Sequence, residues 1–429
     1  METLHFPQYG ETVYHTVHPS GLPIFVWPKP GFRTTYAVIS TRYGSIDTSF
    51  TDAQGHTVTV PAGIAHYLEH KLFENEDCDA MDRFARIGAS CNAYTSFNNT
   101  AYLFTCTDRA PEALEILLDF VQDPYFTEET VQKERGIIEQ EIRMGEDAPS
   151  RRVLFELLRA LYHEHPVKVD IAGTVESIAE ITPDLLYTCY NTFYNLHNMV
   201  LSVCGDITPE QVMEVADRVL KPCADVRPGI PLIDEPRAAV TPRVESVMPV
   251  STTMFTVGYK EYFPPERRGQ YRTPTESAAS TVLLDLLADR GSPLYTRLME
   301  QGLINDDFGA FCYDGPGYAV WMFSGESRDP DAVADAIADE IETVRRTGVD
   351  AERFEAARNA LYGHTVFSLN SVEACAETLV EDTFANRAPL AAVAATATLT
   401  VEDVNALLQN AFDPASRAIS IVKRKDDTV

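Results

Sequence analysis

The stretch Gly63-Ile-Ala-His66-Tyr-Leu-Glu69-His70-Lys-Leu-Phe73 is the point from which the rest of this 429-residue chain can be interpreted. As a helix, it places His66 and His70 four residues apart on one face, with Glu69 beside them. Two imidazoles at this spacing can share one Zn²⁺, and a nearby carboxylate that is not a ligand can take a proton from water. The order His-x-x-Glu-His is the reverse of the commoner His-Glu-x-x-His.

A catalytic zinc site usually has three protein ligands, so two histidines do not complete it. Within residues 133–141, Glu134 and Glu141 lie nearly two helical turns apart and point the same way, whereas Glu139 points elsewhere. A helix packed against the motif helix could give Glu141 to the metal and leave Glu134 to orient a histidine. The alternative is a solvated acidic face, in a chain with 64 acidic residues.

Length and charge limit the possible classes of protein. A chain of this length is expected to form two domains of roughly 200 residues each. The formal net charge of −29 argues against a nucleic-acid partner, because a phosphate-binding surface needs clustered Lys and Arg. An acidic surface that keeps the protein in solution is the simpler explanation of this charge.

The N-terminal segment Met1-Glu-Thr-Leu-His-Phe-Pro lacks the basic start and apolar run of a signal peptide. No segment approaches the roughly 18 uninterrupted apolar residues of a membrane span. We therefore expect a cytoplasmic protein with no membrane partner. The eight cysteines include no Cys-x-x-Cys pair, so we expect reduced thiols and neither a disulfide framework nor a thiolate zinc site.

The second half of the sequence appears as a weaker copy of the first. Five prolines near residues 222–242 indicate an extended linker. We accordingly expect an N-terminal zinc-binding domain at 1–222, a Pro-rich linker at 223–243 and a homologous C-terminal domain at 244–429. A helix expected at Thr273–Ala288 corresponds to the motif helix but contains no histidine. A duplicated domain in which only the first copy kept a metal site is the simplest interpretation.

Three features together resemble one family of zinc peptidases. They are the motif His66–His70, the segment Asn92-Ala-Tyr-Thr-Ser96, and Glu134-Arg135 with Glu141 about seventy residues after the motif. In this order and spacing they resemble the pitrilysin, insulin-degrading enzyme and mitochondrial processing peptidase family, also called inverzincins. The resemblance covers essentially the whole chain. It implies an α+β fold of two duplicated α/β-roll domains, each an antiparallel-rich sheet packed with helices.

The resemblance also implies a metalloendopeptidase that hydrolyses peptide bonds. One Zn²⁺ per chain is expected to bind to His66, His70 and Glu141. Glu134 is expected to orient one of the histidine ligands without binding the metal itself. Zinc would polarise the carbonyl of the peptide bond while Glu69, as general base, deprotonates the water and passes the proton to the leaving amine.

The same resemblance implies that Ser90–Thr95 is an edge strand on which a peptide substrate adds as one more strand. Main-chain pairing of this kind can hold many sequences in one geometry. The expected substrate-binding residues are Asn92, Ala93, Tyr94 and Thr95.

One departure from the family pattern affects the expected partner. Related enzymes carry an Arg and a Tyr in their second half that hold the substrate, and the corresponding positions here are Leu298 and Asn305. The chain therefore looks like the zinc-bearing half of a pair. We expect a homologous partner subunit that supplies the Arg and Tyr, or a homodimer.

Two alternatives remain open from the sequence. The chain could be a non-catalytic structural subunit or a peptide-binding subunit of the same fold, although such proteins usually have an eroded metal motif. The segment His163-Glu-His165-Pro166 could be a second metal pair, but without a third ligand nearby a surface loop is the better interpretation.

Overall fold

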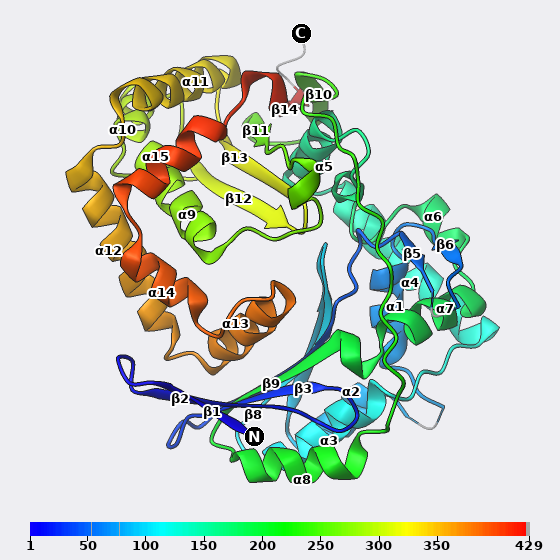
Figure 1. Cartoon of the computed structure of the whole chain (residues 1–429). Helices are drawn as coiled ribbons and strands as arrows, with labels where there is room; N and C mark the ends of the chain where they lie inside the picture. Colours follow the sequence, from blue (N-terminus) through cyan, green and yellow to red (C-terminus); the bar gives the residue numbers. More distant parts are fainter. Residues whose placement is uncertain (53, 77, 426–429) are drawn as a thin grey trace. The chain divides into compact units, whose positions relative to one another are not determined.

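The computed structural model describes residues 1–52, 54–76 and 78–425 (Figure 1). The chain forms two compact units, each built from several separate segments. Unit 1 comprises segments 1–142, 170–231 and 366–390. Unit 2 comprises segments 143–169 and 232–365, together with the chain from Ala391 onward.

The centre of unit 1 is a seven-stranded sheet in the order β1-β2-β3-β9-β4-β8-β7. Neighbouring strands are antiparallel except for the parallel pair β3–β9, and β7 lies at the edge. A separate hairpin, β5–β6, precedes the motif helix. The strands are β1 (Glu2–Phe6), β2 (Glu11–Val17), β3 (Pro23–Pro28), β4 (Thr35–Thr41), β5 (Ser49–Thr51), β6 (Thr57–Thr59), β7 (Ser90–Thr95), β8 (Thr100–Cys106) and β9 (Met199–Gly205).

Helices pack on both faces of this sheet. Several begin with a Thr whose hydroxyl accepts a hydrogen bond from the first turn, as Thr182 and Thr208 do, followed by a proline. The helices of unit 1 are α1 (Ile64–Leu72), α2 (Ala80–Arg86), α3 (Ala110–Phe120), α4 (Glu128–Glu146), α6 (Val175–Ala179), α7 (Pro183–Phe193), α8 (Pro209–Val219) and α13 (Val372–Phe384), and the boundary between the units falls within α4.

Unit 2 has a five-stranded sheet in the order β10-β14-β11-β13-β12. Its strands are β10 (Arg243–Met248), β11 (Met254–Lys260), β12 (Gly309–Gly315), β13 (Tyr318–Glu326) and β14 (Arg417–Arg424). Its helices are α5 (Pro149–Leu161), α9 (Pro274–Ala288), α10 (Pro293–Glu300), α11 (Pro330–Thr347), α12 (Ala351–Ser368), α14 (Ala391–Thr398) and α15 (Val401–Asn410).

The two sheets repeat one topology. The order β10-β14-β11-β13-β12 in unit 2 matches β3-β9-β4-β8-β7 in unit 1, and the first pair is parallel in both. The strands also follow one another in the same chain order, separated by helices at the same places. The expected α+β fold with a duplicated domain is therefore confirmed.

The units do not follow the expected boundaries at 222 and 244, because each half of the sequence gives one helix to the sheet of the other. Helix α5 packs on β11 and β14, and its counterpart α13 packs on β4 and β9. In β4, Ala37 and Ile39 belong to the core beneath the other helices, and the alternate residue Tyr36 contacts α13. The exchange leaves β4 buried on both faces. Residues 221–242, all of them described, contain no helix or strand.

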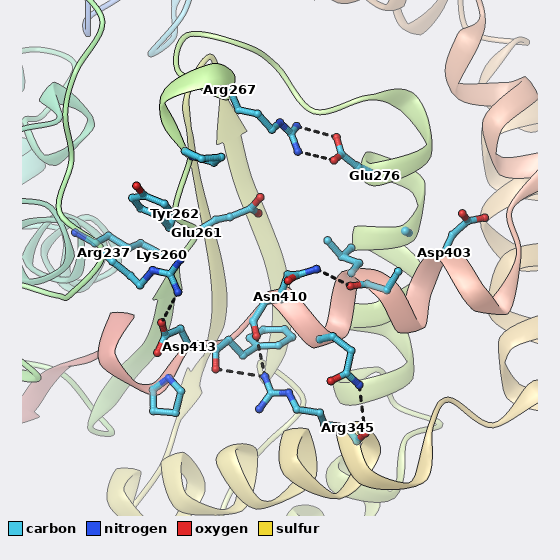
Figure 2. Close-up of a pocket in the computed structure, with 18 of the residues that line it drawn as sticks. Arg237, Lys260, Glu261, Tyr262, Arg267, Glu276, Arg345, Asp403, Asn410 and Asp413 are labelled. Carbon is cyan, nitrogen blue, oxygen red and sulfur yellow. Dashed lines mark hydrogen bonds and ion pairs between the residues drawn. The ribbon is translucent and has the colours of Figure 1, made fainter.

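Unit 2 contains a hollow of about 800 Å³ (Figure 2). The corresponding place in unit 1 is filled by aromatic side chains. In unit 1, Tyr43 stacks on Phe193 with ring centroids 4.0 Å apart, and Phe50 of the β5–β6 hairpin packs edge-on against the same ring at 4.7 Å. Strand pairing matches Thr41–Met199 with Tyr259–Arg417, which places Glu261 where Tyr43 stands and Ala411 where Phe193 stands.

Glu261 and Ala411 both line the hollow. The connection from β11 to α9 is also shorter than the one that carries the hairpin in unit 1. Around the rim, Arg267 is paired with Glu276, and Arg237 lies 3.5 Å from Asp413 (Figure 2). Loss of two aromatic rings and of the hairpin therefore accounts for the hollow.

Within the described residues, no single helix is long and apolar enough to cross a membrane. Helices α14 and α15 meet those criteria only as a pair, and the pair is bent by 101°. The eight cysteines are free thiols in the structure, and Cys106, Cys189, Cys204 and Cys375 are buried.

Candidate active site

Helices α1 and α4 bring two imidazoles and a carboxylate to one point. His66 Nε2 lies 3.6 Å from Glu141 Oε1, and His70 Nε2 lies 3.6 Å from Glu141 Oε2. The possible ligand atoms of the three residues all lie within 4.8 Å of one another. The side chains of His66, His70 and Glu141 are 12%, 25% and 42% exposed, so the site opens to solvent on the Glu141 side.

The packing of α1 explains why both histidines face α4. Tyr67, Leu68 and Leu72 are fully buried in the core of unit 1, which turns the opposite face of the helix outward. The hydroxyl of Tyr67 donates a hydrogen bond to the carbonyl of Val131 and so ties α1 to α4. Before the helix, Gly63 has φ +88°, and a Cβ there would collide with the backbone of residue 172.

Glu134 fixes the orientation of one imidazole. Its Oε1 lies 2.9 Å from His70 Nδ1, and an ionised carboxylate can only accept, so Nδ1 donates and Nε2 is the nitrogen left for a metal ion. Burial opposes a charged His70, but the hydrogen bond to Glu134 and three nearby carboxylates raise its pKa. Burial likewise opposes a charged Glu134, but His70 and two lysines hold its pKa below the usual value.

This donor set fits Zn²⁺. Two neutral imidazole nitrogens and one carboxylate are a common ligand set in catalytic zinc sites. A ligating histidine usually donates its other ring N–H to a carboxylate or a carbonyl, which fixes the orientation of the ring. His66, His70 and Glu141 would hold the ion, and Glu134 would hold the ring of His70 in place.

Glu69 lies between the two histidines in sequence and points toward β7. It is 8% exposed, and Thr95 Oγ1 donates a hydrogen bond of 2.6 Å to its Oε2. Burial raises the pKa of Glu69, while Thr95 and His70 act in the opposite direction. A buried carboxylate with a raised pKa beside a metal site has the properties of a general base.

Among the residues that the structure describes, strand β7 pairs on one side only, with β8. Because Ser96 N donates to Asn99 O at the hairpin turn, antiparallel alternation turns the peptide groups of Cys91, Ala93 and Thr95 away from β8. The N–H of Ala93 donates to the side-chain oxygen of exposed Asn92 at 2.9 Å. These outward groups are the ones that an added strand would pair with.

Three of the four expected substrate residues have polar side chains, and each of these makes a different contact. Asn92 covers the outward N–H of Ala93, Thr95 contacts Glu69, and the hydroxyl of Tyr94 donates to Glu377 Oε2 at 2.8 Å. Glu377 was missed in the sequence, because it lies 283 residues from Tyr94 and no local pattern marks it.

The two positions that correspond to the substrate-holding Arg and Tyr of related enzymes carry Leu298 and Asn305. Leu298 is fully buried in the core of unit 2. Asn305 donates a hydrogen bond from Nδ2 to Glu326 at 3.0 Å.

The segment around His163 and His165 has structural contacts. Glu235 accepts hydrogen bonds from the backbone N–H groups of residues 163, 164 and 165. His165 Nδ1 accepts from Val167 N, and burial lowers the pKa of His165 to about 4. These contacts favour the loop interpretation.

Comparison with known proteins identifies the family. Residues 59–175 match the family model described as insulinase (peptidase family M16), and residues 180–361 match the one described as peptidase M16 inactive domain. Together these matches cover more than half of the chain.

Similar proteins extend over the full length. The chain is 40% identical over 416 residues to an uncharacterised zinc protease, YmfH, of Bacillus subtilis strain 168, covering 95% of this chain and 96% of that protein. It is 35% identical to an M16-like peptidase from Alicyclobacillus acidocaldarius of solved structure, with a TM-score of 0.93 over 98% of this chain and 100% of that one.

A third similarity is partial. The chain is 30% identical over 157 residues to an Arabidopsis thaliana protein named as a mitochondrial-processing peptidase subunit beta, covering 35% of this chain and 30% of that protein. The matched families and the relatives named zinc protease support a metallopeptidase in general terms. The two matched models, the full-length relative and the fold together show that the chain belongs to peptidase family M16, in its half-length form.

Proposed function

We propose that the chain is a zinc-dependent endopeptidase that cleaves peptides or unfolded segments bound as an extra strand on β7. The observation that carries this proposal is the position of Glu69. Its carboxylate is next to the group formed by His66, His70 and Glu141 and is hydrogen-bonded to Thr95 of the free edge strand. Base, metal ligands and peptide-binding edge therefore meet at one place.

The reaction can be assigned to named atoms. A bound Zn²⁺ would act as a Lewis acid that polarises the carbonyl of the peptide bond and makes water at the site more acidic. Because Thr95 is bonded to Oε2 of Glu69, we assign proton transfer to Oε1, which takes a proton from the attacking water. The same oxygen then gives the proton to the nitrogen of the leaving amine.

Strand addition would hold the substrate mainly through its main chain. The outward peptide groups of Cys91, Ala93 and Thr95 would pair with alternate residues of the substrate. Asn92 must release the N–H of Ala93 when this happens. Thr95 then fixes the distance between the added strand and Glu69.

Zinc content and hydrolysis should be measured on the wild type and on Glu69→Gln. We expect about one zinc per chain in both proteins by elemental analysis, with hydrolysis of an unfolded polypeptide reduced by at least about 10³-fold in the variant. The variant keeps the size and polarity of the side chain and loses the base. A wild type that binds no zinc would disprove the proposal.

We further propose that the active form contains a homologous partner subunit. The absence of Arg and Tyr at positions 298 and 305 supports this, as does similarity to a protein named as a subunit of a processing peptidase. Light scattering combined with activity measurements on the purified chain tests it. Full activity of a purified monomer would contradict it.

The alternative is a structural or peptide-binding subunit of the same fold. The hydrolysis measurement on the wild type separates this alternative from the peptidase. A structural or peptide-binding subunit would leave the unfolded polypeptide uncleaved. The intact set of ligands and base favours the peptidase.

A further inference from the structure

Helix α13 reaches the sheet of unit 1 from the second half of the sequence and is fastened there by polar contacts. Just before the helix, buried Lys29 of the β3 end donates to the carbonyl of Leu369 at 2.8 Å and pairs with Glu11 at 2.6 Å. Near its C-terminal end, the guanidinium of Arg42 lies 5.3 Å from the ring centroid of Phe384. The position of α13 on the sheet is therefore well defined.

In the middle of α13, one carboxylate bridges two strands. Glu377 Oε1 accepts a hydrogen bond of 2.5 Å from Tyr36 of β4, and Oε2 accepts one of 2.8 Å from Tyr94 of β7. Since β8 lies between β4 and β7, the carboxylate spans the width of three strands. Burial raises the pKa of Glu377, and the two hydroxyl groups oppose that shift by stabilising the charged form.

The strand β7 is thus held from both faces at consecutive residues. Thr95 points to the α1 face and bonds to Glu69, whereas Tyr94 points to the α13 face and bonds to Glu377. An edge strand has a neighbour on one side alone and is the easiest part of a sheet to displace. A tether on Tyr94 limits how far Thr95 and the outward groups of Ala93 can move relative to Glu69.

We propose that Glu377 is a positioning residue that sets the placement of β7, and with it the substrate strand, relative to the base Glu69. This inference rests on the proposed function. It gives the second half of the chain a role in the reaction although that half carries no metal ligand. Glu377 acts through Tyr94 and Tyr36 and does not itself contact the reacting atoms.

The test compares Glu377→Leu and Glu377→Gln with Glu373→Gln, an exposed carboxylate about one turn earlier on the same helix. We expect kcat/KM of Glu377→Leu for an unfolded peptide to fall by about ten- to a hundredfold with KM raised, because a small displacement of the substrate is costly. The Gln variant should keep most activity, since its amide can accept from one tyrosine and donate to the other. Zinc content should be unchanged, and Glu373→Gln should stay within about twofold of the wild type.

A double-mutant cycle with Tyr94→Phe adds a check on the pathway. If Glu377 acts through Tyr94, the double variant Tyr94→Phe/Glu377→Leu should lose little more than Glu377→Leu alone. Equal and independent losses would overturn the proposal. So would a Glu377→Leu protein with lower Tm but unchanged KM, which indicates a role in stability alone.

Amide hydrogen exchange tests the positioning role of Glu377 without relying on peptidase activity. Glu377→Leu should speed exchange in peptides covering 90–106, with no matching change from Glu373→Gln. If the wild type cleaves no peptide but exchange accelerates, the proposed function fails while the anchoring of β7 stands. Unchanged exchange in 90–106 would overturn the positioning role.

Discussion

Two functional side chains of the site, His70 and Glu69, are each held by a second side chain. Glu134 holds the ring of His70 through Nδ1, and Thr95 holds Glu69 through Oε2. Such contacts reduce the number of orientations available to a ligand before the metal binds, so the entropy cost of ordering is met during folding. The orientation of His70 therefore depends on a residue outside its own helix.

Removing the support of His70 should weaken zinc binding without abolishing it. In Glu134→Ala, we expect affinity for Zn²⁺ to fall by about ten- to a hundredfold, because the ring loses its acceptor and its orientation. Glu134→Gln should lie between this variant and the wild type, since its amide oxygen can still accept from Nδ1. Competition with a fluorescent zinc chelator measures the effect, with Glu129→Ala in the first turn of α4 as control. Equal affinities for all four proteins would contradict the assigned role.

At the scale of elements, the edge strand β7 and the helix α13 matter most. Alternation along β7 separates two functions: residues 90, 92 and 94 pair with β8, and residues 91, 93 and 95 present outward peptide groups. A strand can therefore lose an outward N–H without losing its place in the sheet.

Proline substitution should distinguish the two sets of peptide groups. Ala93→Pro removes one outward N–H, so a bound strand loses about one hydrogen bond. We therefore expect KM for peptide substrates to rise by about tenfold while the protein stays folded. Asn92→Pro removes a hydrogen bond to β8 and should lower Tm as well. Circular dichroism melts and steady-state kinetics measure both. An unaffected KM in folded Ala93→Pro would argue against strand addition at this edge.

A buried carboxylate on α13 makes the stability of unit 1 depend on pH. Burial raises the pKa of Asp382 to about 7, and its Oδ2 accepts a hydrogen bond of 3.0 Å from Leu390 N. An unfolded Asp titrates near about 3.9, so between about pH 4 and 7 the folded protein holds more protons than the unfolded chain. The contribution of Asp382 to stability therefore falls as pH rises through this window.

Asp382→Asn stays neutral at every pH and can still accept the hydrogen bond from Leu390. Its Tm should exceed that of the wild type at about pH 8, and the difference should vanish near pH 4. Calorimetry at several pH values provides the comparison, with the exposed Glu373→Gln expected to parallel the wild type. A difference that grows as pH falls would reverse the sign and exclude this explanation.

At the scale of the whole molecule, the exchange of α5 and α13 makes the two halves of the chain interdependent. Each helix covers a sheet that the other half of the sequence forms. Removing α13 would expose the face of β4 that carries Tyr36 and Val38, both buried in the intact chain. Exposing these apolar side chains to water costs free energy, and the net stability of a folded domain is only about 5–15 kcal/mol.

Splitting the chain after Pro231 tests this dependence. We expect the fragment 1–231 alone to be insoluble or to melt without a cooperative transition, because β4 and β9 lack α13. Co-expression with residues 232–429 should restore a soluble complex that binds zinc. A fragment 1–231 that folds cooperatively and binds zinc as the intact chain does would contradict the expectation.

The sequence by itself determined the local parts of this protein. Helical periodicity placed His66, Glu69 and His70 together, and a two-turn spacing made Glu134 and Glu141 face one way, because such relations depend on the geometry of a single helix. The repeated pattern of helices also predicted the duplication, which the matching strand orders confirm.

The tertiary structure alone decided which distant segments meet. It placed Glu377 against Tyr94, exchanged α5 and α13 between the sheets, and left a hollow where Glu261 and Ala411 replace two stacked rings. None of these follows from periodicity, since each depends on burial across hundreds of residues of sequence. The sequence of a helix determines which of its faces is apolar. Which sheet that face covers depends on the packing of the whole chain.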